Sequence, residues 1–194
     1  GYRVNYKVVN ASDYGVPQNR ERMILVGLRE DVGKTFEFPP VQKDKSKLTL
    51  RNILDIPPET PNQNTYWVYS PQAQNMIEMI PEGGSWKNIP YEKLPPRFQK
   101  IRNNMKKYSR EEICGTITAS AQPEKCGITH PTENRRYTIR EIARIQTFPD
   151  DFLFLDSTKR EVIAMYKVIG NALPCHLAEI LANAILKQGF ETQK

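Results

Sequence analysis

The first 40 residues alternate between apolar and polar positions in a way that predicts two β-strands. From Arg3 to Asn10 every second residue is apolar, which is the period of a strand with one buried face. Residues 23–28 form a continuous apolar run, which is typical of a strand buried on both faces. Because a two-stranded sheet is not stable by itself, we expect residues 1–40 to join a larger structure. The apolar positions of the first strand are Val4, Tyr6 and Val8.

The middle of the chain, residues 41–115, is rich in proline and has few long regular patterns. A helix is expected over Pro71–Met79, because proline is favoured in the first turn of a helix. A second, basic helix is expected over Pro96–Lys107. Between them, Gly83 and Gly84 mark a turn rather than a phosphate-binding loop, since no strand precedes them.

The last third of the chain is more regular and predicts three helices. Thr138 and Glu141 have the spacing of a capping box, in which each side chain satisfies the other residue's free amide at a helix N-terminus. Thr158 and Glu161 repeat that spacing. The final helix has its apolar residues at helical spacing. The three expected helices cover residues 138–146, 158–169 and 174–189.

Composition and charge narrow the class of protein. The 194 residues carry a formal net charge of +6, and 39% are hydrophobic, with a mean hydropathy of -0.61. That apolar content excludes a disordered chain. The basic balance is compatible with a polyanionic partner or with simple solubility. Three cysteines indicate free thiols in a reducing compartment. No run is long enough to cross a membrane and no targeting pattern is present, so we expect a cytosolic protein.

The segment Gln18-Asn19-Arg20-Glu21-Arg22 is the first candidate for chemistry. Two arginines two residues apart point to opposite faces of a strand, so one can reach a ligand while the other holds structure. Guanidinium groups suit phosphates and carbonyl oxygens, because their donors are forked and permanently charged. By composition alone, a solvated charged loop is the favoured interpretation.

Three arginines at positions 136, 140 and 144 would line one face of the expected helix at 138–146 if that helix started a little early. Such a stripe could bind phosphates. It could equally be a surface face that pairs with Glu133 and Glu141, and the residues alone leave both interpretations open.

The cysteines do not suggest catalysis or a metal site. Cys175 is followed by His176, but neighbours on a helix point about 100° apart, so packing is the favoured role. Cys114, Cys126 and His130 lack a Cys-x-x-Cys pair and a fourth ligand, so we expect no metal.

Three blocks of the sequence, in order, resemble the cytosine-5 DNA methyltransferase family. Residues 10–22 contain the Gln-x-Arg-x-Arg of the eighth family motif, and residues 135–152 resemble the ninth motif. Residues 170–174, Gly-Asn-Ala-Leu-Pro, resemble the tenth. A variable region of fitting size lies between the first two blocks, so the resemblance frames nearly the whole chain.

The resemblance implies an α/β fold, in which a target recognition domain adjoins the last strands and the C-terminal helix of a doubly wound methyltransferase domain. Double-stranded DNA lies in the cleft between the two. The implied parts are residues 1–40 at the end of the catalytic sheet, 41–134 as the target recognition domain, 135–169 as the ninth-motif helices, and 170–194 as the tenth-motif turn and the helix that returns to the catalytic domain.

The family transfers a methyl group from S-adenosylmethionine to C5 of a flipped cytosine in a specific duplex sequence, often within a restriction-modification system. Arg22 matches the arginine that approaches O2 of that cytosine, and Arg20 matches its partner near the active-site loop. Asn171 and Ala172 match the turn that touches the methionine part of the cofactor. The implied location is the bacterial cytoplasm, at the nucleoid.

The resemblance also implies residues that contact DNA. Arg136 falls in a motif that mainly organises the recognition domain, which favours a scaffold over a phosphate contact, although it stays among the candidates. Thr116 and Thr118 resemble a Thr-x-Thr stretch near the DNA backbone. The full set of candidates is Gln18, Arg22, Gly83, Gly84, Thr116, Thr118 and Arg136.

Three family motifs do not occur in the sequence: the Pro-Cys-Gln of the nucleophile, the Glu-Asn-Val of the cytosine-binding glutamate and the Phe-x-Gly-x-Gly of the cofactor loop. We therefore expect the chain to be inactive alone and to need the N-terminal half of a methyltransferase. That half would belong to the same polypeptide, which we favour, or to a second subunit of a split enzyme.

Two alternatives remain at this stage: a stand-alone, sequence-specific DNA-binding module, and a regulatory partner of an active methyltransferase. The enzyme interpretation has a structural consequence. Apolar residues that normally face the missing half should form an exposed patch, or a dimer should cover them. The expected patch surrounds Met23, Leu25, Leu177 and Leu181.

Overall fold

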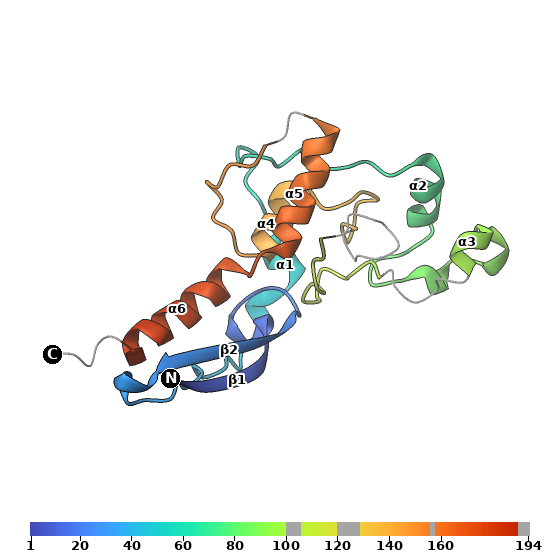
Figure 1. Ribbon diagram of the computed structural model, residues 1–194. Helices are drawn as coiled ribbons and strands as arrows, with labels where there is room; N and C mark the ends of the chain where they lie inside the picture. The colour runs from blue at the N-terminus through green and yellow to red at the C-terminus, as the bar shows by residue number, and fades with distance from the viewer. Residues whose placement is uncertain (100–105, 120–128, 156–157, 190–194) are drawn as a thin grey trace.

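The computed structural model describes residues 1–99, 106–119, 129–155 and 158–189. The two strands are β1 (Tyr2–Asn10) and β2 (Glu21–Arg29), and the helices are α1 (Leu50–Ile53), α2 (Pro71–Glu78), α3 (Pro96–Gln99), α4 (Ile139–Ile145), α5 (Lys159–Asn171) and α6 (Cys175–Gly189). The strand pair and α6 lie on one side of the molecule, α4 and α5 near the middle, and α2 and α3 on the opposite side (Figure 1). The expected mixed α/β class is confirmed.

Strands β1 and β2 form an antiparallel hairpin, in which directly paired residues share a face. One face contains Val9 opposite Arg22 and turns toward the rest of the chain. The other face contains the pairs Val4–Gly27, Tyr6–Leu25 and Val8–Met23.

This second face of the hairpin is apolar and exposed. Its six large apolar side chains are each between 49% and 68% exposed. The expectations that the first strand buries its apolar face and that the second is buried on both faces are therefore wrong for this chain. The reason is that two strands make up the whole sheet in the described ranges, so no layer covers that face. The six side chains are Tyr2, Val4, Tyr6, Val8, Met23 and Leu25.

Helix α6 packs against the first face of the hairpin and the loop that follows β1. Leu177 and Leu181 are 1% and 6% exposed, because apolar side chains of residues 9–16 surround them. The expected patch is thus confirmed for Met23 and Leu25 and wrong for Leu177 and Leu181, which the hairpin side of the same chain covers. The partners of the two leucines are Val9, Ala11, Tyr14 and Val16.

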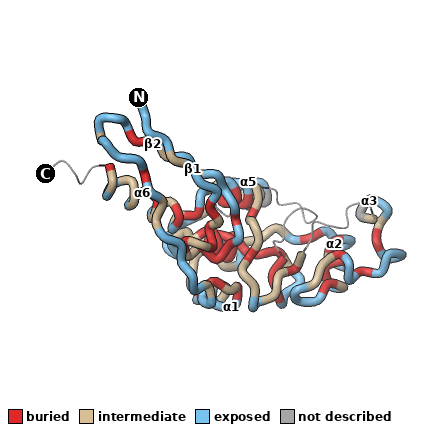
Figure 2. The backbone as a smooth tube through the Cα atoms, turned by 90° about the horizontal axis from the view of Figure 1, so that it is seen from below, coloured by how far each residue is buried: buried red, intermediate tan, exposed pale blue. Residues whose placement is uncertain are grey.

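The largest core lies between α4 and α5. Figure 2 shows the buried residues gathered in the middle of the molecule, with the hairpin exposed at one end. Ile142 and Ile145 of α4 and Ile169 of α5 are fully buried there. The irregular segment 114–117 enters the same core through Cys114 and Ile117. A stretch without regular secondary structure is thereby fixed by packing.

Capping fixes where the helices begin. Thr138 and Glu141 form the expected capping box, and the side chain of Thr158 accepts a hydrogen bond from the Glu161 backbone as expected. Helix α2 begins after Ser70, with Pro71 in its first turn, as the sequence predicted.

The expected helix over Pro96–Lys107 is confirmed only at its start. Helix α3 covers Pro96–Gln99 of the described residues, and Lys106 and Lys107 are not helical. Residues 100–105 lie outside the described part of the chain.

A second, separate core lies on the side of α2. It consists of Ala73, Met76 and Ile77 of the helix and the loop residues that follow it. Lys107 anchors this core to the rest of the molecule, since its Nζ donates to Asn134 Oδ1 at 2.8 Å. The loop residues of this core are Ile80, Trp86, Ile89 and Leu94.

The stretch Arg160–Gly189 has the length and hydropathy of one candidate membrane span, with 28% of its apolar window buried. It consists, however, of two helices of 13 and 15 residues separated by a turn. Each is shorter than the roughly 20 residues that span a bilayer, so this candidate is weak.

Candidate functional site

The loop between β1 and β2 carries the glutamine-arginine motif, and Asn10 closes it. The side-chain oxygen of Asn10 accepts hydrogen bonds from the backbone N–H of Ser12 at 3.3 Å and of Arg20 at 3.0 Å. The backbone N–H of Ala11 donates to the carbonyl of Arg20 at 2.9 Å. An asparagine that caps its own turn is a common way to close a loop. The motif is therefore held at a fixed position beside the end of β1.

The segment 114–118 runs beside this loop. The backbone N–H of Asn19 donates to the Cys114 carbonyl at 2.7 Å, and Gln18 forms an isolated parallel bridge with Cys114. The hydroxyl of Thr116 donates to the Asn19 carbonyl at 2.9 Å. The candidates Gln18 and Thr116, almost 100 residues apart in sequence, are thus neighbours in the structure.

Arg20 connects three parts of the chain. Its Nη1 donates to the Ile117 carbonyl at 2.7 Å, and its Nη2 donates to the Gly170 carbonyl at 3.1 Å. The side chain is buried, and burial together with the positive charge of Arg22 lowers the pKa of Arg20. Both carbonyl partners belong to the protein, so Arg20 holds structure while Arg22 remains available to a ligand.

Gln18 makes a second connection in parallel with Arg20. Its side-chain oxygen accepts from the Ile117 backbone N–H at 2.9 Å, and its Nε2 donates to Gln146 Oε1 at 3.0 Å. Gln146 Nε2 in turn donates to the Ile169 carbonyl at 2.7 Å. All three hydrogen bonds are buried, where each lost partner would leave a costly unsatisfied group.

Gly170 lies in close contact with segment 114–118. A Cβ at this position would overlap the Thr118 carbonyl and approach Ala119 N to 2.7 Å. Both contacts are with backbone atoms, which cannot move aside as a side chain would. Only glycine therefore lets the end of α5 approach this segment so closely.

Arg22 and Asn171 are both exposed and lie next to this buried connection. Arg22 follows Arg20 by two residues at the start of β2, and its Nη1 donates to the Glu21 carbonyl at 2.7 Å. Asn171 ends α5 directly after Gly170, and Ala172 caps the helix through its backbone N–H. Because Arg20 binds the Gly170 carbonyl, the two exposed candidates are held in one region of the molecule.

The turn at residues 170–174 is also held from its far side, by Gln146 and Thr147. The Gln146 carbonyl accepts from the Cys175 backbone N–H at 3.1 Å, and Thr147 Oγ1 accepts from the His176 N–H at 2.9 Å. Thr147 has φ 59, a left-handed conformation that is unfavourable for a β-branched residue. Sequence reasoning missed both residues, because no local pattern indicates a partner so distant in the chain.

Gly83 and Gly84 are far from this site in the described structure and belong to the loop beside the second core. Gly83 has φ 73, which explains the need for glycine. The carbonyl of Gly84 accepts a hydrogen bond from the Lys107 backbone N–H at 2.9 Å.

Arg136 is buried among aromatic rings. Its guanidinium carbon lies 4.6 Å from the Trp67 ring centre and 4.5 Å from that of Tyr69, and Nη1 donates to the Trp67 carbonyl at 3.0 Å. A guanidinium stacked in this way is held by cation–π attraction and has little surface left for a phosphate. The scaffold role fits these contacts better than DNA binding.

The other two arginines of the stripe are also scaffold residues. Arg140 is fully buried and donates to three backbone carbonyls, those of Pro61, Pro149 and Phe152. Arg144 pairs with Asp150 and donates to the Asp55 carbonyl at 2.8 Å. The stripe thus organises the loops around α4.

The cysteines have the character of packing residues. Cys114 is fully buried, and burial raises the pKa of its thiol to about 12, so it stays protonated and unreactive. Burial also raises the pKa of Cys175. Cys126 lies outside the described residues. Within the described ranges, no group of three potential metal ligands comes together.

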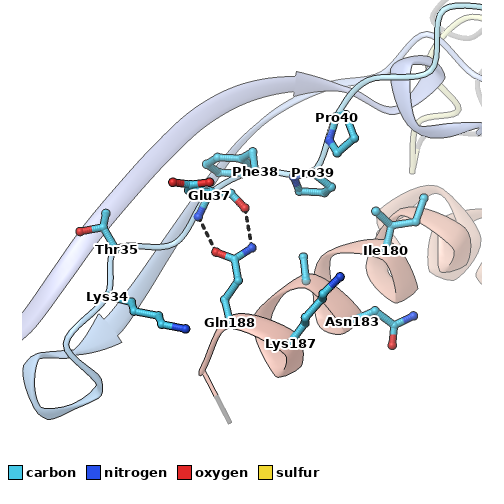
Figure 3. Close-up of a pocket in the computed structure, with 11 residues that line it drawn as sticks. Lys34, Thr35, Glu37, Phe38, Pro39, Pro40, Ile180, Asn183, Lys187 and Gln188 are labelled. Carbon is cyan, nitrogen blue, oxygen red and sulfur yellow. Dashed lines mark hydrogen bonds between the residues drawn. The ribbon is translucent and has the colours of Figure 1, made fainter. Parts of the chain in front are cut away.

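A groove of about 930 Å³ lies between residues 34–40 and the C-terminal half of α6. Figure 3 shows Gln188 pairing with the backbone of Glu37 in the groove, with Lys34 and Lys187 nearby. Glu37 N donates to Gln188 Oε1 at 2.7 Å, and Gln188 Nε2 donates to the Glu37 carbonyl at 2.8 Å. The candidate residues surround the other end of α6, so this groove is separate from the site.

Comparison with known proteins places this geometry in a family. The family model of C-5 cytosine-specific DNA methylase matches residues 1–187. Among curated relatives, the type II methyltransferase M.MthTI of Methanothermobacter thermautotrophicus is 36% identical, and the alignment covers 96% of this chain and 57% of that protein. M.Sau96I of Staphylococcus aureus is 32% identical, over 96% of this chain and 44% of that protein.

Solved structures agree on the fold. A prophage-encoded protein described as a DNA modification methyltransferase (E. coli) aligns with a TM-score of 0.58 and 19% identity, over 96% of this chain and 61% of that chain. The S. pombe Dnmt2 methyltransferase aligns with a TM-score of 0.55 and 16% identity, over 96% and 58%.

The chain spans about half the length of the curated relatives it matches. The family model covers nearly all of it, residues 1–187, a range that includes every residue joined by the buried hydrogen bonds of Gln18 and Arg20. The chain belongs to the C-5 cytosine-specific DNA methylase family.

Proposed function

We propose that this chain is the DNA-recognising, cofactor-closing part of a DNA (cytosine-5) methyltransferase. The complete enzyme would transfer a methyl group from S-adenosylmethionine to C5 of cytosine in a specific duplex sequence, in a restriction-modification system. The observation that carries the proposal is the double hydrogen bond of Arg20 to Ile117 and Gly170. It connects the loop that leads into Arg22 at the start of β2, the segment 114–118 with its two candidate DNA contacts, and the turn at residues 170–174 that contains Asn171.

Arg22 is the residue we assign to the reacting base. Its guanidinium is exposed, whereas the neighbouring Arg20 is buried and donates from Nη1 and Nη2 to protein carbonyls. A charged donor at O2 of a flipped cytosine would polarise the ring toward attack at C6. The nucleophile itself would come from the Pro-Cys-Gln motif that this sequence lacks.

Asn171 and Ala172 are the residues we assign to the cofactor. Asn171 is exposed at the end of α5, where its amide can donate and accept hydrogen bonds toward the amino-acid part of S-adenosylmethionine. The cofactor supplies the methyl group when it is bound. The chain's own contribution is to hold this turn in a fixed place beside Arg20.

Thr116, Thr118 and the loop at Gly83–Gly84 are the candidates for DNA contacts. Thr116 is half-buried and directly precedes Ile117, whose backbone is hydrogen-bonded to the side chains of Gln18 and Arg20. The Thr116 hydroxyl donates to the Asn19 carbonyl here and would exchange that bond for one to a phosphate oxygen, a contact that positions a protein on DNA without reading its sequence. The loop beside the second core would then supply sequence recognition.

The rest of the methyltransferase is the partner we assign to the exposed hairpin face. Six large apolar side chains on one face of a sheet indicate a surface that another layer should cover. The relatives are about twice as long as this chain, which supports a further segment of comparable size, and we assign it to the N-terminal half that would supply that layer.

A chimeric enzyme tests the proposal. The N-terminal segment of M.MthTI would be fused to this chain, and transfer of tritiated methyl groups from S-adenosylmethionine to duplex DNA would be measured. We expect transfer by the fusion and none by this chain alone. Robust transfer by the chain alone, or a folded, DNA-binding fusion without any transfer, would contradict the proposal.

A stand-alone DNA-binding role makes a different prediction. It requires tight, sequence-selective binding of duplex DNA by this chain without cofactor or partner. A gel shift with random-sequence duplexes, followed by selection of bound sequences, distinguishes the two roles.

A further inference from the structure

Gln146 occupies a place that the residues assigned so far do not explain. It is fully buried in the C-cap of α4, and its side-chain amide bonds at both ends: Oε1 accepts from Gln18 and Nε2 donates to the Ile169 carbonyl. An apolar residue would fill this space without needing partners. The presence of an amide therefore indicates a role for its hydrogen bonds to Gln18 and to the Ile169 carbonyl.

The hydrogen bonds through Gln146 form a continuous chain across the site. The Ile117 N–H donates to Gln18, Gln18 donates to Gln146, and Gln146 donates to the Ile169 carbonyl. One end is thus the segment that carries Thr116 and Thr118. The other end is the last turn of α5, directly before Gly170 and Asn171.

The Gln146 carbonyl and the Thr147 hydroxyl hold the other end of the cofactor turn. Gln146 accepts from the Cys175 N–H through its carbonyl, and Thr147 accepts from the His176 N–H. The five residues 170–174 are therefore fixed on both sides by Gln146 and Thr147. The left-handed φ of Thr147 shows that the backbone adopts a sparsely populated conformation to do so.

We propose that Gln146 is a positioning residue that couples the DNA-contacting segment 114–118 to the cofactor turn 170–174. This inference rests on the proposed function for the identity of the two ligands. Its structural content does not, because the buried contacts all join residues of this chain. A displacement of segment 114–118 should therefore change the position of turn 170–174, and the reverse, which is the physical meaning of coupling between two sites.

Hydrogen–deuterium exchange of the 194-residue chain tests this coupling. In Gln146→Met, Gln18 and Ile169 each lose a partner. We expect the amides of Ile117 and Ala172 to exchange about tenfold faster or more, as the loss of a buried hydrogen bond would produce. The amide of Val162, at the far end of α5, should keep its rate. Ile145→Val, in the same turn of α4, is the matched control, because it removes packing but no polar contact.

Acceleration at Ile117 and Ala172 in Gln146→Met but not in Ile145→Val supports the inference. Equal acceleration of all core amides in both variants would overturn it, since Gln146 would then only stabilise the fold. If Gln146→Met fails to fold, the double variant Gln18→Met/Gln146→Met replaces both amides and leaves neither unpaired. In the double variant the Ala172 amide should exchange faster than in the unaltered chain while the Val162 amide keeps its rate, whereas an unchanged Ala172 rate would overturn the inference.

The fusion enzyme supplies a second readout. Gln146→Met should raise KM for S-adenosylmethionine about tenfold with a smaller effect on kcat, because the cofactor turn loses its fixed position. An unchanged KM together with accelerated exchange would overturn the positioning role. The exchange experiment reads the coupling whether or not methyl transfer is obtained, so the inference and the proposed function can fail separately.

Discussion

At the scale of single residues, Gly170 is the position where the structure leaves least room for change. In Gly170→Ala the new Cβ would overlap the backbone of Thr118 and Ala119. We expect a loss of about 1–3 kcal/mol in the free energy of unfolding, the usual range for overpacking a core. Gly189→Ala is the matched control, since its Cβ would meet nothing nearer than Leu28 Cδ2 at 3.7 Å. Urea denaturation of both variants measures the difference, and equal stability of the two would refute the close approach.

His130 is the residue that should make stability depend on pH near neutrality. It is buried beside Glu133, Glu141, Arg135 and Lys107, and burial lowers its pKa more than the charge of Glu141 raises it. The folded protein therefore resists protonation that the unfolded chain accepts below about pH 6.5. Stability should be fully present above that pH and fall as the pH drops below it.

The His130→Gln variant should lose this part of the pH dependence. Thermal unfolding between pH 7 and pH 5 measures it, and His176→Gln, at an exposed position, is the control that should retain the slope. A slope that persists unchanged in His130→Gln would show that another group is responsible.

At the scale of elements, α4 depends on its capping box. Thr138 and Glu141 satisfy each other's backbone amides, and Arg135 holds the Glu141 carboxylate through hydrogen bonds of 2.7 and 2.9 Å. Thr138→Ala should lower the free energy of unfolding by about 1–2 kcal/mol, the upper part of the range for a lost N-cap, because the freed amide is buried. Thr158→Ala removes an exposed cap from α5 and should have the smaller effect in the same chemical denaturation series.

At the scale of the whole molecule, the hairpin face determines how the chain behaves in solution. Tyr6 and Leu25 lie opposite each other on that face and are 68% and 61% exposed. We expect the isolated chain to self-associate, and Tyr6→Lys/Leu25→Lys to remain monomeric in sedimentation velocity runs. Lys7→Gln, on the other face of β1, is the control. A chain that stays monomeric at every concentration would show that the face needs no cover.

The sequence predicted those parts of the fold that local patterns specify. The capping box at Thr138, the side-chain cap of Thr158 and the proline-led start of α2 are present, because each depends on residues three or four apart. The burial of the two strands was predicted wrongly, because alternation reports which face is apolar and not whether another layer covers it.

The long-range hydrogen bonds of the site could not be predicted from local patterns either. The motif around Arg20 is visible in the sequence, but its carbonyl partners are 97 and 150 residues away and carry no side-chain signature. Gln146 was missed for this reason, since its partner Gln18 is 128 residues away. Backbone partners and long-range amide pairs are set by packing, which a single sequence does not specify.

The central claim is that Arg22 and Asn171 serve one active site from opposite ends of the Arg20 connection. Steady-state kinetics of methyl transfer by the fusion enzyme tests it most directly. Arg22→Ala should lower kcat about 100-fold or more, as the loss of a transition-state donor does, while Asn171→Ala should mainly raise KM for S-adenosylmethionine. If both variants transfer methyl groups with unchanged kcat and KM, these residues do not form the site and the account is wrong.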